Sequence, residues 1–208
     1  MNVVPPVDAP MTDVQRARQE RMLDVAAELA TSGGYDAVQM RAVASGAEVA
    51  LGTLYRYFPS KEHLLVSVML RQVETLSERL SVRPAGGVTA SERVDEILGR
   101  ATGALLRQPE FTTAVMRALV AGDGSVVPAV RRVREAMHSI VLEAMGTPAT
   151  DLDDDPDAAR DVLVADLLEE VWFSALVGWI SGVYPASSIT EKLSAATSLL
   201  LGAQDPPA

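Results

Sequence analysis

The chain lacks cysteine, which excludes disulfide bridges and metal sites built on thiolates. It holds only two histidines, His63 and His138, which lie far apart in the sequence. No arrangement of Ser, His and Asp predicts a nucleophilic triad, and no cluster has metal-ligand spacing. We therefore expect a protein that is not an enzyme and that needs no metal or cofactor.

Long apolar runs are also missing. Charged residues or glycine interrupt each apolar stretch before about 18 residues, so no segment is predicted to span a membrane. Residues 1–11 contain three prolines but no basic flank or long apolar run. We expect a disordered arm there, rather than a signal peptide, and a cytoplasmic protein.

The acidic stretch from Asp151 to Asp157 begins like a calcium-binding EF-hand loop. Its sixth position is Pro156, where such loops need glycine, and its twelfth is Val162, where they need glutamate. Calcium binding is therefore not expected.

Basic charge is scarce, and the net charge is -10. Taken alone, this acidity argues against a nucleic-acid partner. The distribution of the charge points the other way, because the windows 14–21 and 39–63 are each locally basic. The arginines of the first window either reach a DNA backbone or form a solvated helix face.

What the sequence does contain is helical periodicity. Apolar residues recur at helical spacing, and no strand alternation competes. Ser60 is a predicted N-cap, Gly33-Gly34 a predicted helix stop, and Thr89–Glu92 and Ser188–Glu191 predicted capping boxes. The sequence predicts an all-α protein of about nine helices, at about 13–32, 39–46, 51–57, 60–80, 89–107, 109–121, 126–145, 156–182 and 188–201.

The short helices at 39–46 and 51–57 have the minimum spacing of a helix-turn-helix. Leu54 is predicted to point inward and Val49 to fill the gap between the helices. The remaining side chains of the second helix suit DNA, because hydroxyls donate to phosphate oxygens and Arg56 can pair with phosphate or guanine. The alternative is a surface helix whose aromatic side chains pack on a neighbour. The predicted contact residues are Leu51, Gly52, Thr53, Tyr55, Arg56, Tyr57 and Lys61.

The stretch 34–65, with Gly52-Thr53-Leu54-Tyr55 and then Phe58 and Lys61, closely resembles the DNA-binding domain of TetR-family transcriptional regulators. The resemblance implies a two-fold dimer with helix 51–57 in the major groove, and it adds Gln39 and Arg41 as phosphate contacts. Two positions depart from the family. Glu48 stands where glycine is frequent, so a positive φ would be strained there. Leu51 stands where a polar residue is frequent, which suits a thymine methyl group.

Residues 90–145 are rich in Leu, Met, Val and Ala at helical spacing. Apolar pockets between bundle helices are usual ligand sites, and methionines adapt to bulky ligands. The alternative is plain core packing. Asp166, Glu169 and Glu170 are expected to form a solvated face, and both histidines to be ordinary helix residues, with His63 on the surface. The candidate effector-binding residues are Phe111, Val115, Met116, Leu119, Met137, Ile140, Trp172, Phe173 and Leu176.

A weaker resemblance, at 33–35, 37–44 and 170–172, is to family members that repress sterol catabolism. It implies a steroid-derived effector, such as a coenzyme A thioester, and a dimer interface on helices 156–182 and 188–201. The expected division is an arm at 1–11, a helix-turn-helix domain at 12–59, and an effector-binding and dimerisation domain at 60–208. The expected function is a homodimeric repressor that a hydrophobic effector releases from a palindromic operator. The alternatives are a TetR-type regulator of drug efflux or fatty acid genes, and an all-α ligand-binding protein without DNA function.

Overall fold

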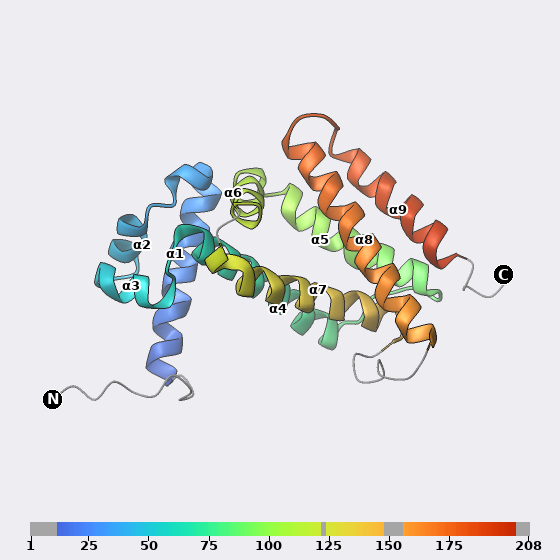
Figure 1. Cartoon of the computed structure of the whole chain (residues 1–208), viewed down its shortest axis with the longest axis horizontal. Helices are drawn as coiled ribbons and strands as arrows, with labels where there is room; N and C mark the ends of the chain where they lie inside the picture. The colour runs from blue at the N-terminus through green and yellow to red at the C-terminus, as the bar shows by residue number, and fades with distance from the viewer. Residues whose placement is uncertain (1–11, 122–123, 148–155, 203–208) are drawn as a thin grey trace.

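The computed structural model describes residues 12–121, 124–147 and 156–202 (Figure 1). The described residues form α-helices and one short 3-10 helix, with no strand among them, which confirms the all-α prediction. The expected arm at 1–11 and the acidic stretch 151–155 lie outside them. The helices are α1 Asp13–Ala37, α2 Met40–Gly46, α3 Leu51–Tyr57, α4 Lys61–Val82, α5 Ala90–Leu106, α6 Pro109–Leu119, η1 Gly124–Val126, α7 Val127–Met145, α8 Pro156–Ile180 and α9 Ser187–Leu201.

The first helix bends near its C-terminal end. Its start is fixed by Thr12, whose hydroxyl accepts from the backbone N–H of Gln15 at 3.2 Å. Gly33 and Gly34 leave the helical conformation, and Gly34 takes a φ of 66°. The predicted stop at these glycines is therefore a break, after which one more helical turn continues to Ala37.

Two of these three predicted helix caps are confirmed, and the third is wrong. Thr89 and Glu92 form the expected capping box, and the Ser60 hydroxyl accepts from the backbone N–H of His63 at 3.1 Å. The capping box predicted at Ser188–Glu191 is wrong, because α9 already begins at Ser187 and its N-cap, Ala186, makes no side-chain bond. The backbone N–H of Ser188 is bonded to a carbonyl of the preceding turn, so this residue lies inside the helix.

Helices α1 to α3 lie at one end of the molecule and α9 lies at the other (Figure 1). The long helix α4 leads from the first group into a bundle with α5 to α9. Helix α1 packs against α6 and α4, so both groups share one hydrophobic core. No described helix is long and apolar enough to cross a membrane.

Candidate functional site

Helices α2 and α3 form a helix-turn-helix with a strained turn. Glu48 has a φ of 54°, in the left-handed region that favours glycine. The next residue, Val49, donates its backbone N–H to the Ala44 carbonyl at 2.9 Å and packs against the core. Glu48 therefore adopts a positive φ, which glycine would adopt without strain.

The second helix of this pair presents one buried and one open face. Leu54 is fully buried, as predicted. Gly52, Tyr55 and Arg56 are exposed, whereas Leu51, Thr53 and Tyr57 are partly buried. A Cβ atom added at Gly52 would meet nothing within 4 Å, so packing inside this chain does not require glycine there. The open face leaves room for another molecule to approach the backbone.

The residues that flank the predicted DNA contact differ in whether their side chains have hydrogen-bond partners within the chain. Arg41 is exposed on α2. Gln39 is also exposed, and its side-chain amide donates to the Asp36 carbonyl at 2.9 Å. The Lys61 ammonium donates to the Tyr35 carbonyl at 3.1 Å, so it has a partner inside the chain.

Tyr35 links the helix-turn-helix region to α6. Its ring lies between two cations, the Lys61 ammonium at 3.7 Å from the ring centre and the Arg117 guanidinium of α6 at 4.0 Å. Its hydroxyl donates to the Glu62 carboxylate. Burial, followed by this hydrogen bond, raises the pKa of Tyr35 to about 12. The phenol therefore stays protonated and keeps its hydrogen bond at physiological pH.

His63 does not lie on the surface, contrary to expectation. Its ring is half-buried, 6.0 Å from the ring of Phe58, and its Nδ1 has no hydrogen-bond partner. Burial lowers the pKa of His63, so the neutral form is favoured there. The ring is partly covered because Phe58, the residue that ends α3, lies beside the first turn of α4.

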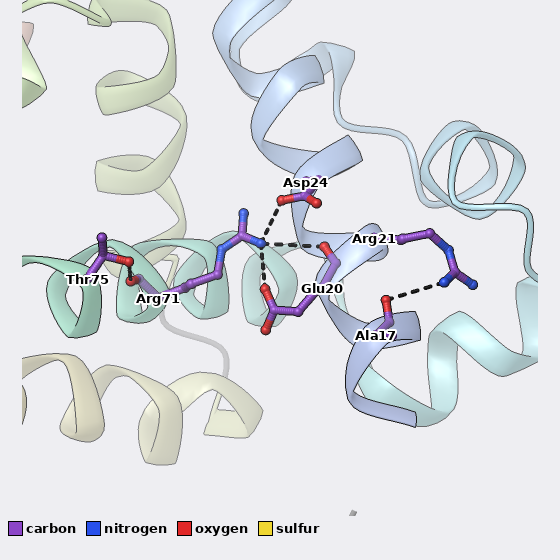
Figure 2. A network of polar contacts seen from close by, with 6 residues as sticks. All are labelled: Ala17, Glu20, Arg21, Asp24, Arg71 and Thr75. Carbon is purple, nitrogen blue, oxygen red and sulfur yellow. Dashed lines mark hydrogen bonds and ion pairs between the residues drawn. The ribbon is translucent and has the colours of Figure 1, made fainter. Parts of the chain in front are cut away.

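Arg71 of α4 joins α1 to α4 (Figure 2). Its guanidinium nitrogen lies 2.8 Å from a Glu20 carboxylate oxygen and 2.7 Å from a carboxylate oxygen of Asp24. Arg21, by contrast, points away from this network and approaches the Ala17 carbonyl of its own helix at 3.5 Å (Figure 2). Arg71 thus ties the first helix to the bundle.

An apolar cavity of about 320 Å³ lies between α4, α5, α6, α7 and α8. Seven of the nine candidate effector-binding residues line it: Val115, Met116, Leu119, Met137, Trp172, Phe173 and Leu176. The other two, Phe111 and Ile140, do not line the cavity, because their side chains are buried in the core packing between helices. The wall is completed by residues outside that candidate set: Met69, Val73, Leu105, Thr112, Val130, Val133, Arg134, Glu169 and Glu170.

Glu169 is the main correction to the expected solvated face. Its side chain is 8% exposed and lies in the cavity wall, whereas Glu170 is exposed and Asp166 is half-buried. Burial raises the pKa of Glu169 to about 7, although the nearby Arg134 guanidinium opposes the shift. The spacing of Glu169, Trp172 and Leu176 on one helical face could have revealed this position.

The surroundings of Glu169 leave one oxygen unpaired. The His138 Nδ1 lies 3.4 Å from Oε1, close enough for an ion pair if the imidazole is protonated. The contact does not have hydrogen-bond geometry, and Oε1 accepts no hydrogen bond. A distance of 3.4 Å alone does not satisfy a buried oxygen.

A basic groove of about 550 Å³ adjoins the cavity. It is lined by Arg71, Arg79, Arg100 and Arg107, with no carboxylate among its described lining residues. It shares Met69, Val73, Leu105, Met137 and Trp172 with the cavity wall. The apolar cavity and the basic groove therefore lie side by side. Within 12–121, 124–147 and 156–202, no group of His, Asp and Glu side chains is placed to hold a metal ion.

The sequence matches two known protein families. Residues 22–68 match the family described as bacterial regulatory proteins, tetR family, and residues 87–200 match the tetracyclin repressor-like C-terminal domain. The transcriptional repressor KstR of Rhodococcus jostii is 40% identical over 191 residues, which cover 92% of this chain and 86% of that protein. KstR of Mycolicibacterium smegmatis is 37% identical over 198 residues, 94% of this chain and 93% of that protein.

Solved structures agree with this relationship. A TetR transcriptional regulator from a Rhodococcus species has a TM-score of 0.80 and 35% identity, over 91% of this chain and 98% of that one. Thermus thermophilus FadR, in complex with lauroyl-CoA, shares the fold with a TM-score of 0.69 and 21% identity, over 91% and 96% of the two chains. The chain therefore belongs to the TetR family and is a TetR-type transcriptional repressor.

Proposed function

We propose that this repressor binds a palindromic operator as a homodimer and leaves it when an amphipathic effector fills the cavity and the basic groove. The observation that carries the proposal is the position of α6. This helix supplies part of the cavity wall and packs along α1, the first helix of the DNA-reading domain. The proposed division of the chain is a DNA-reading domain at 12–59 and an effector-binding and dimerisation domain at 60–208.

The open face of α3 supports the DNA contact. Arg56 and Tyr55 are exposed there, and Gly52 leaves the backbone accessible. In a helix-turn-helix dimer, the two reading helices enter the major groove about one helical turn apart, roughly 34–36 Å. Lys61 contributes its charge near the phosphates while its side chain stays on Tyr35.

The apolar surface of the last two helices supports the dimer. Leu163, Leu167 and Val177 of α8 and Leu199 of α9 are exposed. Exposed large apolar side chains of this kind are available for a contact between proteins. The arrangement is suited to a four-helix interface formed by α8 and α9 with their two-fold copies.

The effector acts through a difference in its affinity for two states of the repressor. Val115, Met116 and Leu119 of α6 face the cavity, and Arg117 of the same helix lies over Tyr35 beside the reading helices. A ligand that displaces α6 therefore also displaces the cation that packs on Tyr35. The same movement reaches α1, which packs on α6.

The chemistry of the two hollows supports an acyl-CoA-like effector. The cavity lies at the lower end of the range of about 300–1,000 Å³ that is usual for small-molecule sites, and it suits an apolar body. In the basic groove, Arg79 and Arg107 suit phosphate groups, which arginine binds well, whereas Arg71 and Arg100 already pair with carboxylates. The relatives named KstR favour a steroid-derived thioester, and the FadR fold relative, which was crystallised with lauroyl-CoA, favours a fatty acyl thioester as the second candidate.

The test begins with selection of bound duplexes from genomic DNA, followed by titration of the best duplex at several salt concentrations. We expect a palindrome bound at nanomolar affinity, with affinity that falls steeply as salt rises. A steroid-CoA thioester and lauroyl-CoA are then added in turn, and the effective one weakens operator binding. Folded protein that enriches no duplex would contradict the proposal and favour a ligand-binding protein without DNA function.

A matched variant separates the two halves of the proposal. Val130→Phe places a larger side chain in the cavity wall of α7, far from α3 along the chain. We expect it to keep operator affinity and to lose the response to the effector. A full response from this variant would exclude the cavity as the effector site.

A further inference from the structure

One arginine of the basic groove also forms a link to the DNA-reading domain. Arg71 lines the groove, and its guanidinium holds the Glu20 and Asp24 carboxylates of α1 at 2.8 Å and 2.7 Å (Figure 2). Arg100, by contrast, pairs with Glu96 of its own helix, so a change in that pair stays within α5. Among the described residues that line the groove, Arg71 is therefore the arginine whose ion pairs reach α1.

This link uses only one nitrogen of the guanidinium. Nη1 of Arg71 makes all of the polar contacts that the group has with the described part of the chain: the two carboxylates and, at 3.4 Å, the Glu20 carbonyl. A guanidinium carries five N–H donors, so the donors on Nη2 and Nε remain available. Arg71 can therefore receive an anion before it leaves α1.

The link is also exposed to water. The side chain of Arg71 is 25% exposed, and those of Glu20 and Asp24 are 49% and 60% exposed. Ion pairs that water reaches contribute little to stability, because water solvates the separated charges almost as well. Phosphate groups form charge-assisted hydrogen bonds with arginine, frequently two in parallel. A polyphosphate ligand in the groove therefore competes with the two carboxylates for this side chain.

We propose that phosphate groups in the basic groove draw Arg71 away from Glu20 and Asp24, and that this exchange loosens α1 and promotes release of the operator. The inference rests on the proposed function, because it takes the groove to hold the phosphate end of the effector. It goes further in assigning the response to one side chain. Arg79 and Arg107, which have no ion pair among the described residues, hold the phosphates first.

The exchange adds a second route between the effector and α1. This helix packs against both α4 and α6. The apolar body in the cavity acts on α6, whereas the phosphates act on Arg71 of α4. The two ends of an acyl-CoA-like molecule therefore act on two different contacts of the same helix.

The test measures the affinity of coenzyme A, which carries the phosphates and no acyl group, by calorimetry on the full-length protein. The double variant Glu20→Gln, Asp24→Asn removes the carboxylates that compete for Arg71 and keeps their shape. We expect it to bind coenzyme A about 3-fold or more tightly than wild type does. A gain in affinity cannot result from partial unfolding. Glu28→Gln removes another exposed carboxylate of α1 and should leave the affinity within about 2-fold at physiological salt, which screens distant charges.

The same double variant in an Arg71→Gln background separates competition from a general gain of positive charge. Without the arginine, the Glu20→Gln and Asp24→Asn changes should leave coenzyme A affinity within about 2-fold, because they release no side chain. The second measured quantity is the ratio of operator affinity without and with a steroid-CoA thioester or lauroyl-CoA. The double variant should lower this ratio by about 3-fold or more, because α1 has already lost the link.

The outcomes separate this inference from the proposed function. If a thioester releases the operator, and the double variant changes neither coenzyme A affinity nor the operator ratio, the inference is wrong while the proposed function stands. An equal gain in coenzyme A affinity with and without Arg71 would also overturn the inference, since the gain would then come from charge alone. If neither coenzyme A nor either thioester binds the wild-type protein, the groove fails as an effector site and the inference fails with it.

Discussion

Replacing Glu169 with glutamine should remove a loss of folding stability that the wild-type protein shows as pH rises. The carboxyl group titrates at about 7 in the folded chain, against an ordinary value of 4.5. Between these values the folded chain binds more protons than the unfolded chain, so its stability falls as pH rises. At about 1.4 kcal/mol for each pH unit, ionised Glu169 lowers the free energy of unfolding by about 3 kcal/mol above pH 7 relative to acidic pH.

Urea denaturation at about pH 5 and about pH 8, at one fixed protein concentration, measures this effect. Other groups also titrate over this range. The free energy of unfolding is therefore measured at both pH values for each protein, and its change between them is compared between wild type and Glu169→Gln. We expect the variant to gain on the order of 2 kcal/mol over wild type at the higher pH, and little at the lower one. Glu135→Gln serves as the exposed control. Equal pH dependence in wild type and Glu169→Gln would refute the reasoning about burial.

Three further predictions concern the DNA-reading region and its contact with α6. Arg56→Ala should weaken operator binding by about 10-fold or more and leave the urea midpoint unchanged, because Arg56 is exposed; unchanged affinity would remove it from the DNA contact. Glu48→Gly should raise the free energy of unfolding by about 1 kcal/mol, since it relieves a positive φ, and an unchanged or lower urea midpoint would argue against strain there. Arg117→Ala should keep operator affinity within a few-fold and reduce the ligand-induced loss of binding, as measured by fluorescence anisotropy with and without effector. A full ligand response in that variant would exclude the contact with Tyr35 as part of the coupling.

Local signals were sufficient for most of the helices. Thr89 and Glu92 mark the start of α5 because a capping box depends on contacts within one turn. The same reasoning failed at Ser188, where the preceding turn had already entered the helix. Helix starts that depend on how the chain leaves the previous helix are not encoded in four residues alone.

The sequence also indicated the right helices for the cavity, and several of its residues, such as Trp172 and Met116. It placed Phe111 in the cavity wall, although this side chain belongs to the core. Apolar side chains in a core and in a ligand site obey the same periodicity, so a pattern in one helix cannot separate them. Whether space remains beside a side chain depends on the neighbouring helices.

By itself, the sequence determined the all-α class, the helix-turn-helix with Leu54 inside and Arg56 outside, and the membership of the TetR family. These features depend on local periodicity and on short motifs. Only the tertiary structure decided that Lys61 packs on Tyr35, that Arg71 ties α1 to α4, and that Glu169 is buried in the cavity wall. The physical reason is that a charged side chain acquires its solvation and its partners from helices distant in sequence, and no spacing along one helix specifies them.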